Sequence, residues 1–194
     1  ESDNWCNMAK NCSEIGEKRN VVSENARTSF VFSFQLFGKV PKISMKTIFD
    51  KETHDELLER IGRLAADTER QWGKMSPVQA MEHTARVLEM ATSDEQPIKQ
   101  IFLGKALGWI FKGQFLGEKP FRKNAPTGPD YVIKDEPDME LTRERLKVMI
   151  TKFHGLGRDG LDGNVHPFFG PLTGKQWGET QYKHLDHHLR QFGV

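Results

Sequence analysis

Apolar residues recur with the period of an α-helix through most of the chain after residue 45, and this pattern restricts the fold more than any other feature. Residues 51–67 form the first such segment, with Leu57, Ile61 and Leu64 on one face. Two later segments begin with capping boxes, S-P-V-Q at 76–79 and T-G-K-Q at 173–176, in which a hydroxyl residue and a glutamine satisfy free backbone N–H groups. The pattern predicts an α-helix at each of these places.

Five helices are expected in total, over residues 51–67, 76–92, 98–115, 139–154 and 173–192. Glycines at positions 104, 108 and 113 interrupt the third of them and argue against one straight helix. The connection 117–138 is rich in proline and glycine and long for a compact domain, so we expect it to wrap the bundle or to line a site. No segment of this region alternates like a strand. The predicted fold class is all-α, a four-helix bundle with an additional short helix and long connecting loops.

The first 44 residues differ from the rest of the chain. They show no helical periodicity and do not begin with methionine, whereas Met45 starts a segment that runs directly into the first helix. We expect residues 1–44 to be an N-terminal extension, disordered or derived from sequence upstream of the true start, and residues 45–194 to form the folded domain. The alternation of Phe30, Phe32 and Phe34 leaves another possibility, in which this stretch forms a strand or packs on the bundle.

Charge and cysteine content exclude some classes of protein. The 194 residues include 28 basic and 27 acidic ones, a balance that argues against a nucleic acid or an anionic membrane as the main partner. No apolar run reaches the roughly 18–20 residues that cross a bilayer. The two cysteines, Cys6 and Cys12, make no disulfide framework, so a reducing, cytoplasmic location is expected. The expected partner is a small-molecule substrate, and a homodimer is a possible state.

Histidines crowd the last predicted helix, which ends in K-H-L-D-H-H-L-R-Q-F-G-V. His184 and His188 are four residues apart, so they project from one helix face with Cβ atoms about 6 Å apart and can bind one metal ion. Two surface or capping histidines are the alternative, but an apolar stripe beside the pair indicates that it faces inward. His187 lies about 60° and 100° around the helix from the two, which gives it an outward or supporting position. Gln191 continues the histidine face by one turn.

Two histidines leave a divalent ion short of ligands, so a third one is expected elsewhere. The candidates are His54, His83, His154 and His166. Only His83 lies inside a strong helix on a face that looks buried, although a lone histidine there is commonly a hydrogen-bonded core residue. His54 and His154 look like surface residues. His166 precedes the last helix in a loop and could approach the site without being a ligand.

Several kinds of catalytic centre find no support in the sequence. A zinc peptidase helix has glutamate directly after its first histidine, and Leu185 occupies that position. There is no G-x-S-x-G motif, no cysteine after residue 12 and no P-loop. A peptidase, a nucleophilic triad and a P-loop nucleotide site are therefore not expected.

Three stretches together point to a known family. They are S-P-V-Q-A-M-E-H at 76–83, H-P-F-F-G-P-L-T-G-K-Q-W at 166–177, and the last helix with H-x-x-x-H followed by Gln191. These resemble the DinB-like (YfiT-like) superfamily of metal-dependent helical bundles, in particular an uncharacterised branch, and the resemblance covers about residues 45–194. It implies one divalent metal ion, usually zinc or nickel, held by His83, His184 and His188. Some members are thiol-dependent transferases or isomerases acting on small molecules.

Two classes of function follow from these expectations. In the first, the metal keeps a coordination position open and activates water or a low-molecular-weight thiol, which suits an S-transferase or a hydrolase acting on small molecules. Gln191, His166 and His187 would then support the metal ligands or orient the substrate, and the sequence identifies no general base. In the second, the protein is a non-catalytic binding module in which the metal joins two helices.

Overall fold

The computed structural model describes residues 45–95 and 99–194 of the chain, so the predictions for residues 1–44 and for residue 98 lie outside the described residues. The elements are α1 (Lys51–Gly62), α2 (Pro77–Ala91), α3 (Phe102–Leu116), the short 3₁₀ helix η1 (Pro129–Tyr131), α4 (Met139–Leu156), the 3₁₀ helix η2 (Asp159–Leu161), β1 (Val165–His166), β2 (Gly170–Pro171) and α5 (Gly174–Gln191).

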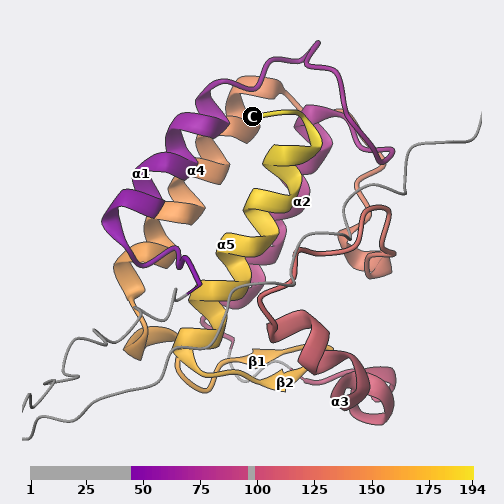
Figure 1. Cartoon of the computed structure of the whole chain (residues 1–194), viewed down its shortest axis with the longest axis vertical. Coiled ribbons are helices and arrows are strands. Elements are labelled where there is room, and N and C mark those ends of the chain that lie inside the picture. Colours follow the sequence, from indigo (N-terminus) through magenta and orange to yellow (C-terminus); the bar gives the residue numbers. More distant parts are fainter. Residues whose placement is uncertain (1–44, 96–98) are drawn as a thin grey trace, which may run out of the picture. The chain divides into compact units, whose positions relative to one another are not determined.

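Four of the helices form the bundle. α4 packs against α1 and α2, and α5 packs against the same two helices from the other side. Figure 1 shows α1 and α4 side by side, with α2 and α5 beside them, and α3 near one end next to the two strands. The prediction of an all-α bundle with an additional helix and long loops is therefore confirmed.

Large apolar side chains from all four bundle helices fill the core. Each of them contributes about 1.5–3 kcal/mol when it leaves water, and the fully buried ones with the largest volumes are Trp177, Phe153, Ile48, Leu57, Ile61, Met81, Leu88, Leu146, Ile150, Leu161, Leu172 and Leu185. The apolar side chains of α2 and α5 both point into this core, and the two helices therefore contact each other. That contact brings His83 on α2 close to His184 and His188 on α5.

An ion-pair network joins α2 to α4 beside the core. Glu82 is 8% exposed and accepts from Arg86 at 2.7 Å and from Arg145 at 2.6 Å, and Arg145 also contacts Glu89 at 2.6 Å. Burial favours the neutral acid, but the hydrogen bonds from Arg145 and Arg86 outweigh it and lower the pKa of Glu82. The network thus fixes α2 against α4 with a charged carboxylate.

Helix boundaries agree with the predictions at the capped starts and differ at the ends. Both capping boxes form, with Ser76 accepting from the Gln79 N–H and Thr173 from the Gln176 N–H. The first helix ends at Gly62 instead of residue 67, since the Thr68 hydroxyl accepts a hydrogen bond from the Ala65 N–H and forms a turn there. α4 continues two residues further than predicted, to Leu156.

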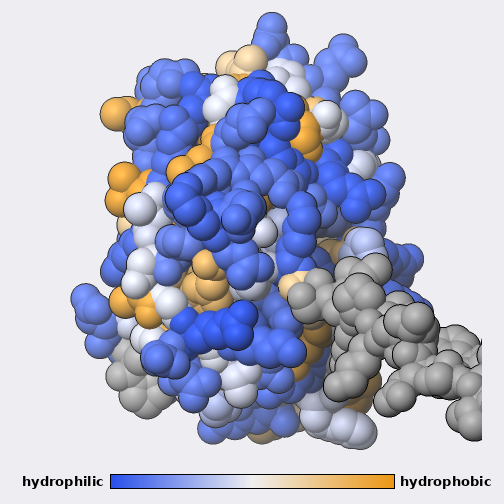
Figure 2. All heavy atoms as spheres, turned by 60° about the vertical axis from the view of Figure 1, so that its left-hand side comes forward, coloured by the Kyte–Doolittle hydropathy of each residue, from blue (hydrophilic) through white to orange (hydrophobic). Residues whose placement is uncertain are grey.

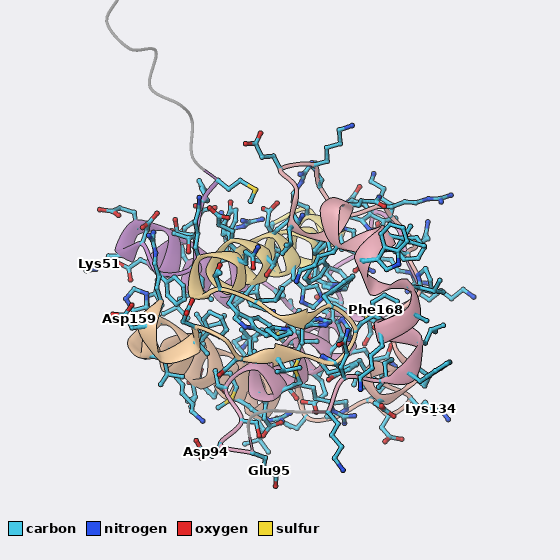
Figure 3. All side chains as sticks on the ribbon, turned by 90° about the horizontal axis from the view of Figure 1, so that it is seen from below. Lys51, Asp94, Glu95, Lys134, Asp159 and Phe168 are labelled. Atoms are coloured by element: carbon cyan, nitrogen blue, oxygen red, sulfur yellow. The ribbon has the colours of Figure 1, made fainter. Side chains whose placement is uncertain are left out.

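The glycines of the third segment do not break it, because α3 is one continuous helix over Phe102–Leu116. Gly104 and Gly108 are buried where the helix meets the loop between the strands, and a Cβ atom at either position would overlap the carbonyl oxygen of Phe168. Phe168 is labelled beside α3 in Figure 3. These glycines permit close packing, which is a tertiary requirement that the sequence pattern does not distinguish from a helix break.

A short β-hairpin with two residues in each strand was not expected from the sequence. β1 and β2 pair antiparallel, with His166 opposite Gly170, and the turn contains Phe168 and Phe169. Gly170 has a φ of 73°, a conformation that favours glycine. The strands are too short to give an alternating pattern, so their pairing depends on the local turn and on packing against α3.

The surface is polar over much of the bundle. Figure 2 brings α1 and α4 forward and shows a mostly hydrophilic face with isolated hydrophobic residues. Among the described residues, none of the helices is both long enough and apolar enough to pass through a bilayer.

Candidate metal centre

The position of His83 follows from the way α2 is built. Ser76 caps the helix, Pro77 begins it, and the buried face that follows contains Ala80, His83 and other residues that contact the core. His83 is only 3% exposed. It therefore faces the interior, as predicted from its neighbours.

α5 supplies the other two histidines. The helix is held at its start by the Thr173–Gln176 capping box and by Gly174, whose backbone N–H donates to Asp162 at 2.9 Å. His184 and His188 then follow on one face, each partly buried at the edge of the apolar stripe that Leu185 and Leu189 form.

The structure brings His83, His184 and His188 together. Each pair of rings has a centroid distance of 5.0 Å, and each residue offers a ring nitrogen that lies within 4.8 Å of those of the other two. The Nε2 atoms of His83 and His184 are 3.1 Å apart. Two helices separated by about a hundred residues thus present three imidazoles to one point.

Hydrogen bonds fix the orientation of two of these rings. The Nδ1 of His83 is 2.9 Å from the carbonyl oxygen of Tyr131, which can only accept, so Nδ1 carries the proton and Nε2 carries a lone pair. Because the Tyr131 carbonyl comes from the long connection between α3 and α4, that connection lines the site, which is one of the two arrangements expected for it.

Gln191 holds the His188 ring in the same way. Its amide nitrogen donates to the carbonyl of Trp72 at 2.9 Å, which turns its Oε1 toward the Nδ1 of His188 at 3.0 Å. The His188 Nδ1 therefore donates, and its Nε2 is left with a lone pair. Gln191 is 3% exposed, so water does not compete for these bonds.

The three histidines are kept neutral. Burial, followed by the nearby His188 and His83 rings, holds the pKa of His184 well below its usual value, and burial lowers the pKa of His188 to about 3. Burial also lowers the pKa of His83. Neutral imidazoles are the form that binds a metal ion.

Aromatic side chains from the loops surround the histidines. The ring of Phe121 lies 6.2 Å from that of His184 and 6.1 Å from that of His187, and the Trp72 ring lies 5.8 Å from His187. Trp72, Phe121 and His187 also line a cleft of about 360 Å³, together with Lys123, Tyr182 and Lys183. A small molecule in this cleft would meet both aromatic faces and charged groups close to the histidine cluster.

Lys183 ties the end of α3 to α5. Its Nζ donates to the carbonyls of Phe115 and Gly117, each at 2.6 Å, and lies 4.4 Å from the centre of the Phe121 ring. Burial lowers the pKa of Lys183 to about 8. The contact places Phe121 over His184, so Lys183 positions the aromatic cover of the site.

The remaining histidines do not join the cluster. His166 lies in β1, where its Nδ1 accepts from the Phe168 and Phe169 N–H groups and its ring packs against Phe115 and Trp177. Within the described residues, it makes no ring contact with the three clustered histidines. His187 is partly buried and packs on Trp72, Phe121 and His188, at the edge of the cleft.

His54 and His154 contact each other instead, with ring centroids 4.5 Å apart, and the Nδ1 of His154 donates to the carbonyl of Ile48. Both are partly buried, so the prediction that they lie on the surface is only half correct. Neither belongs to the cluster of possible ligands, in agreement with the interpretation that set them aside.

Sequence reasoning did not single out Trp72, Phe121 or Lys183. The first two lie in connections that have no periodicity, and their position depends on how the loops fold over α5. Lys183 precedes His184 directly, but a lysine next to a polar helix face gives no signal that distinguishes burial from exposure.

Comparison with known proteins gives one family. A family model described as a protein of unknown function, DUF1569, matches residues 45–193. The curated proteins and the solved structures give no match.

Proposed function

The chain belongs to the DUF1569 family of proteins of unknown function, and we propose that its three-histidine cluster binds one divalent metal ion and serves an enzymatic reaction on a small molecule. The observation that carries the proposal is the convergence of His83, His184 and His188, which two helices present to one point.

The distances in the cluster fit a metal ion. Two imidazole nitrogens at about 2.05 Å from a tetrahedral zinc ion lie about 3.3 Å from each other, and the Nε2 atoms of His83 and His184 are 3.1 Å apart. A hydrogen bond between these two rings accounts for that one distance. It does not account for the position of His188. The Nδ1 of His188 donates its proton to Gln191, so its Nε2 carries a lone pair that this hydrogen bond does not use. A cation shared by all three lone pairs accounts for the whole arrangement.

Imidazole nitrogens suit zinc and nickel, and these are the metals we propose. Among the described residues, the cluster contains no fourth histidine, cysteine or carboxylate, so a coordination position would remain for a small molecule. When bound there, such a metal lowers the pKa of water or of a low-molecular-weight thiol toward neutrality, which serves hydrolysis or S-transfer.

The chain's own residues would hold the substrate. The cleft next to the cluster offers the rings of Trp72 and Phe121 for apolar contact, and His187 at its edge for a hydrogen bond. We further propose that the family is a branch of the DinB-like superfamily, because the histidines implied by that resemblance are those that the fold brings together.

The alternative function is a metal-stabilised binding module without catalysis. The same geometry favours it in one respect, since an ion held by His83 on α2 and by His184 and His188 on α5 would join two helices of the bundle. Its contribution would then be to the free energy of unfolding alone.

A metal analysis of the purified protein tests the shared part of both functions. We expect close to one equivalent of zinc or nickel in the wild type, a large loss in His83→Ala and in His188→Ala, and no loss in the control His54→Ala. Metal content that is unchanged in the two ligand variants would contradict the metal site itself.

Cobalt substitution then separates the enzyme from the module. Azide or a small thiol should shift the visible spectrum of the cobalt protein if a coordination position is open. A spectrum that does not respond to either ligand would overturn the enzymatic proposal and leave the module.

A further inference from the structure

The outward face of α3 is apolar and has no partner among the described residues. Phe102 is 87% exposed, Trp109 76%, Leu103 54% and Ile110 52%. Figure 3, seen from below, shows side chains of this helix projecting away from the rest of the molecule. A contiguous apolar surface on one helix is unusual for a protein that meets only water.

The orientation of α3 is fixed from its opposite side. Gly104 and Gly108 lie directly against the Phe168 carbonyl, with no room for a Cβ atom. The Ile101 N–H donates to the carbonyl of Pro167 at 2.9 Å, and the Lys112 Nζ donates to the carbonyl of Pro171 at 3.1 Å. Because the glycine face must stay on the hairpin, the helix cannot turn its aromatic residues inward.

The exposed residues form two rows along the helix. Phe102 and Trp109 are seven residues apart, as are Leu103 and Ile110, so each pair lies nearly in line along the axis. The two rows are adjacent, and together they make a continuous apolar strip on the side away from Gly104 and Gly108. Three further exposed apolar residues, Ile101, Leu107 and Phe111, lie on α3 or directly before it, whereas Leu141 and Val148 are on α4.

The charges on α3 and next to it in the sequence are almost all positive. α3 contains no acidic residue, and residues 99–123 include six basic residues and one acidic residue, a net charge of +5. Of the six, Lys99, Lys105, Lys119, Arg122 and Lys123 are exposed. None of the six forms an ion pair within the described residues. The near-zero net charge of the whole chain therefore hides an excess of positive charge in the segment that contains the apolar strip.

We propose that α3 binds to an anionic lipid surface, with its apolar strip in the interfacial region and its basic residues at the headgroups. A helix with tryptophan, phenylalanine and leucine on one side and lysines beside them has the composition of an interfacial helix. The charge complements phosphate headgroups. A second copy of this chain fits less well, because a symmetric contact through α3 would bring two segments of charge +5 together.

This proposal differs from the expectation, drawn from the overall charge balance, that a membrane is not the main partner. It does not rest on the proposed metal site, since no residue of the strip belongs to the histidine cluster. The helix is also too short to span a bilayer, so the contact is peripheral.

Vesicle co-sedimentation of the full-length protein tests the proposal. We expect binding to vesicles of equal parts phosphatidylcholine and phosphatidylglycerol, weaker binding at high salt, and little binding to phosphatidylcholine alone. The variant Phe102→Ser/Trp109→Ser should lower the partition constant more than tenfold for each residue. The variant Lys99→Gln/Lys105→Gln/Lys119→Gln should lower it about a hundredfold, since each lysine near an anionic surface contributes about fivefold.

Leu141→Ser/Val148→Ser is the matched control, because it removes two exposed apolar residues from α4 and should bind as the wild type does. Circular dichroism of each variant checks that the helices remain. Equal binding to neutral vesicles, no binding to either kind, or unchanged binding of the α3 variants would overturn the proposal. A concentration-dependent dimer that Phe102→Ser/Trp109→Ser dissociates, without vesicle binding, would assign the strip to a second copy instead.

Discussion

Replacing Gln191 with methionine removes the hydrogen bonds that orient His188 and leaves the side-chain volume nearly unchanged. In the wild type, the Gln191 amide accepts from the His188 Nδ1 at 3.0 Å and donates to the Trp72 carbonyl at 2.9 Å. Both bonds lie in the interior, since Gln191 is 3% exposed. Methionine can make neither, so the His188 ring would be free to rotate or to change tautomer.

Two effects follow, with separate magnitudes. Loss of the partner that orients a metal-binding imidazole lowers metal affinity about 10–100-fold, which corresponds to about 1.4–2.7 kcal/mol. In the metal-free protein, the Trp72 carbonyl loses its donor, which costs about 1–3 kcal/mol of unfolding free energy if no water replaces it. The backbone bond from the Gln71 N–H to the Gln191 carbonyl does not involve the side chain and should remain.

The affinity is measured by competition between the protein and a chromophoric zinc chelator at neutral pH, and stability by thermal unfolding of the metal-free protein. Gln181→Met is the matched control on the same helix. Gln181 is 2% exposed, and its Oε1 has no hydrogen-bond partner among the described residues, so methionine there should leave zinc affinity within about twofold and stability equal or higher. Zinc affinity of Gln191→Met within twofold of the wild type, or an equal loss in Gln181→Met, would refute the role given to Gln191.

Three further predictions concern the stability of the fold. Burial lowers the pKa of His166 to about 4, while a histidine in the unfolded chain has a pKa near 6.5. The unfolded state therefore takes up the proton first, and the free energy of unfolding falls as the pH drops from about 6.5 toward 4. Between pH 7 and pH 5, urea titrations should show that the wild type loses about 2 kcal/mol more than His166→Phe. Gly155→Ala should stabilise α4 by up to about 1 kcal/mol, because the new Cβ meets nothing within 4 Å. Gly174→Ala should destabilise the fold, because its Cβ would overlap the Arg158 backbone. The melting temperature of each variant, compared with that of the wild type, checks both. Glu82→Gln should lower the free energy of unfolding by about 1–3 kcal/mol, since two arginines lose a charged acceptor. In a double-mutant cycle, Glu82→Gln combined with Arg145→Met should lower it by less than the sum of the two single variants.

Several features of the fold were predictable because they depend on residues close together in the chain. The capping boxes at Ser76 and Thr173 form within four residues, so the starts of α2 and α5 agree with the prediction. The shared face of His184 and His188 is likewise a consequence of the helical period alone.

Other features depended on contacts that no local pattern reports. The glycines of α3 looked like interruptions, and only the Phe168 carbonyl against them shows that they are packing positions in a continuous helix. The early end of α1 depends on the Thr68 hydroxyl, and the hairpin at His166 is too short for any periodicity to reveal it.

The helices, the bundle class and the histidine pair on α5 could be predicted from the sequence, because hydrogen bonds and side-chain spacing within one helix act over a few residues. The tertiary structure alone decided that His83 meets that pair, that Gln191 and Tyr131 orient the rings, and that Trp72, Phe121 and Lys183 border the site. It also decided that the apolar side of α3 faces outward. These arrangements arise where segments far apart in the chain bury their apolar faces together, and that packing depends on the whole set of side chains at once.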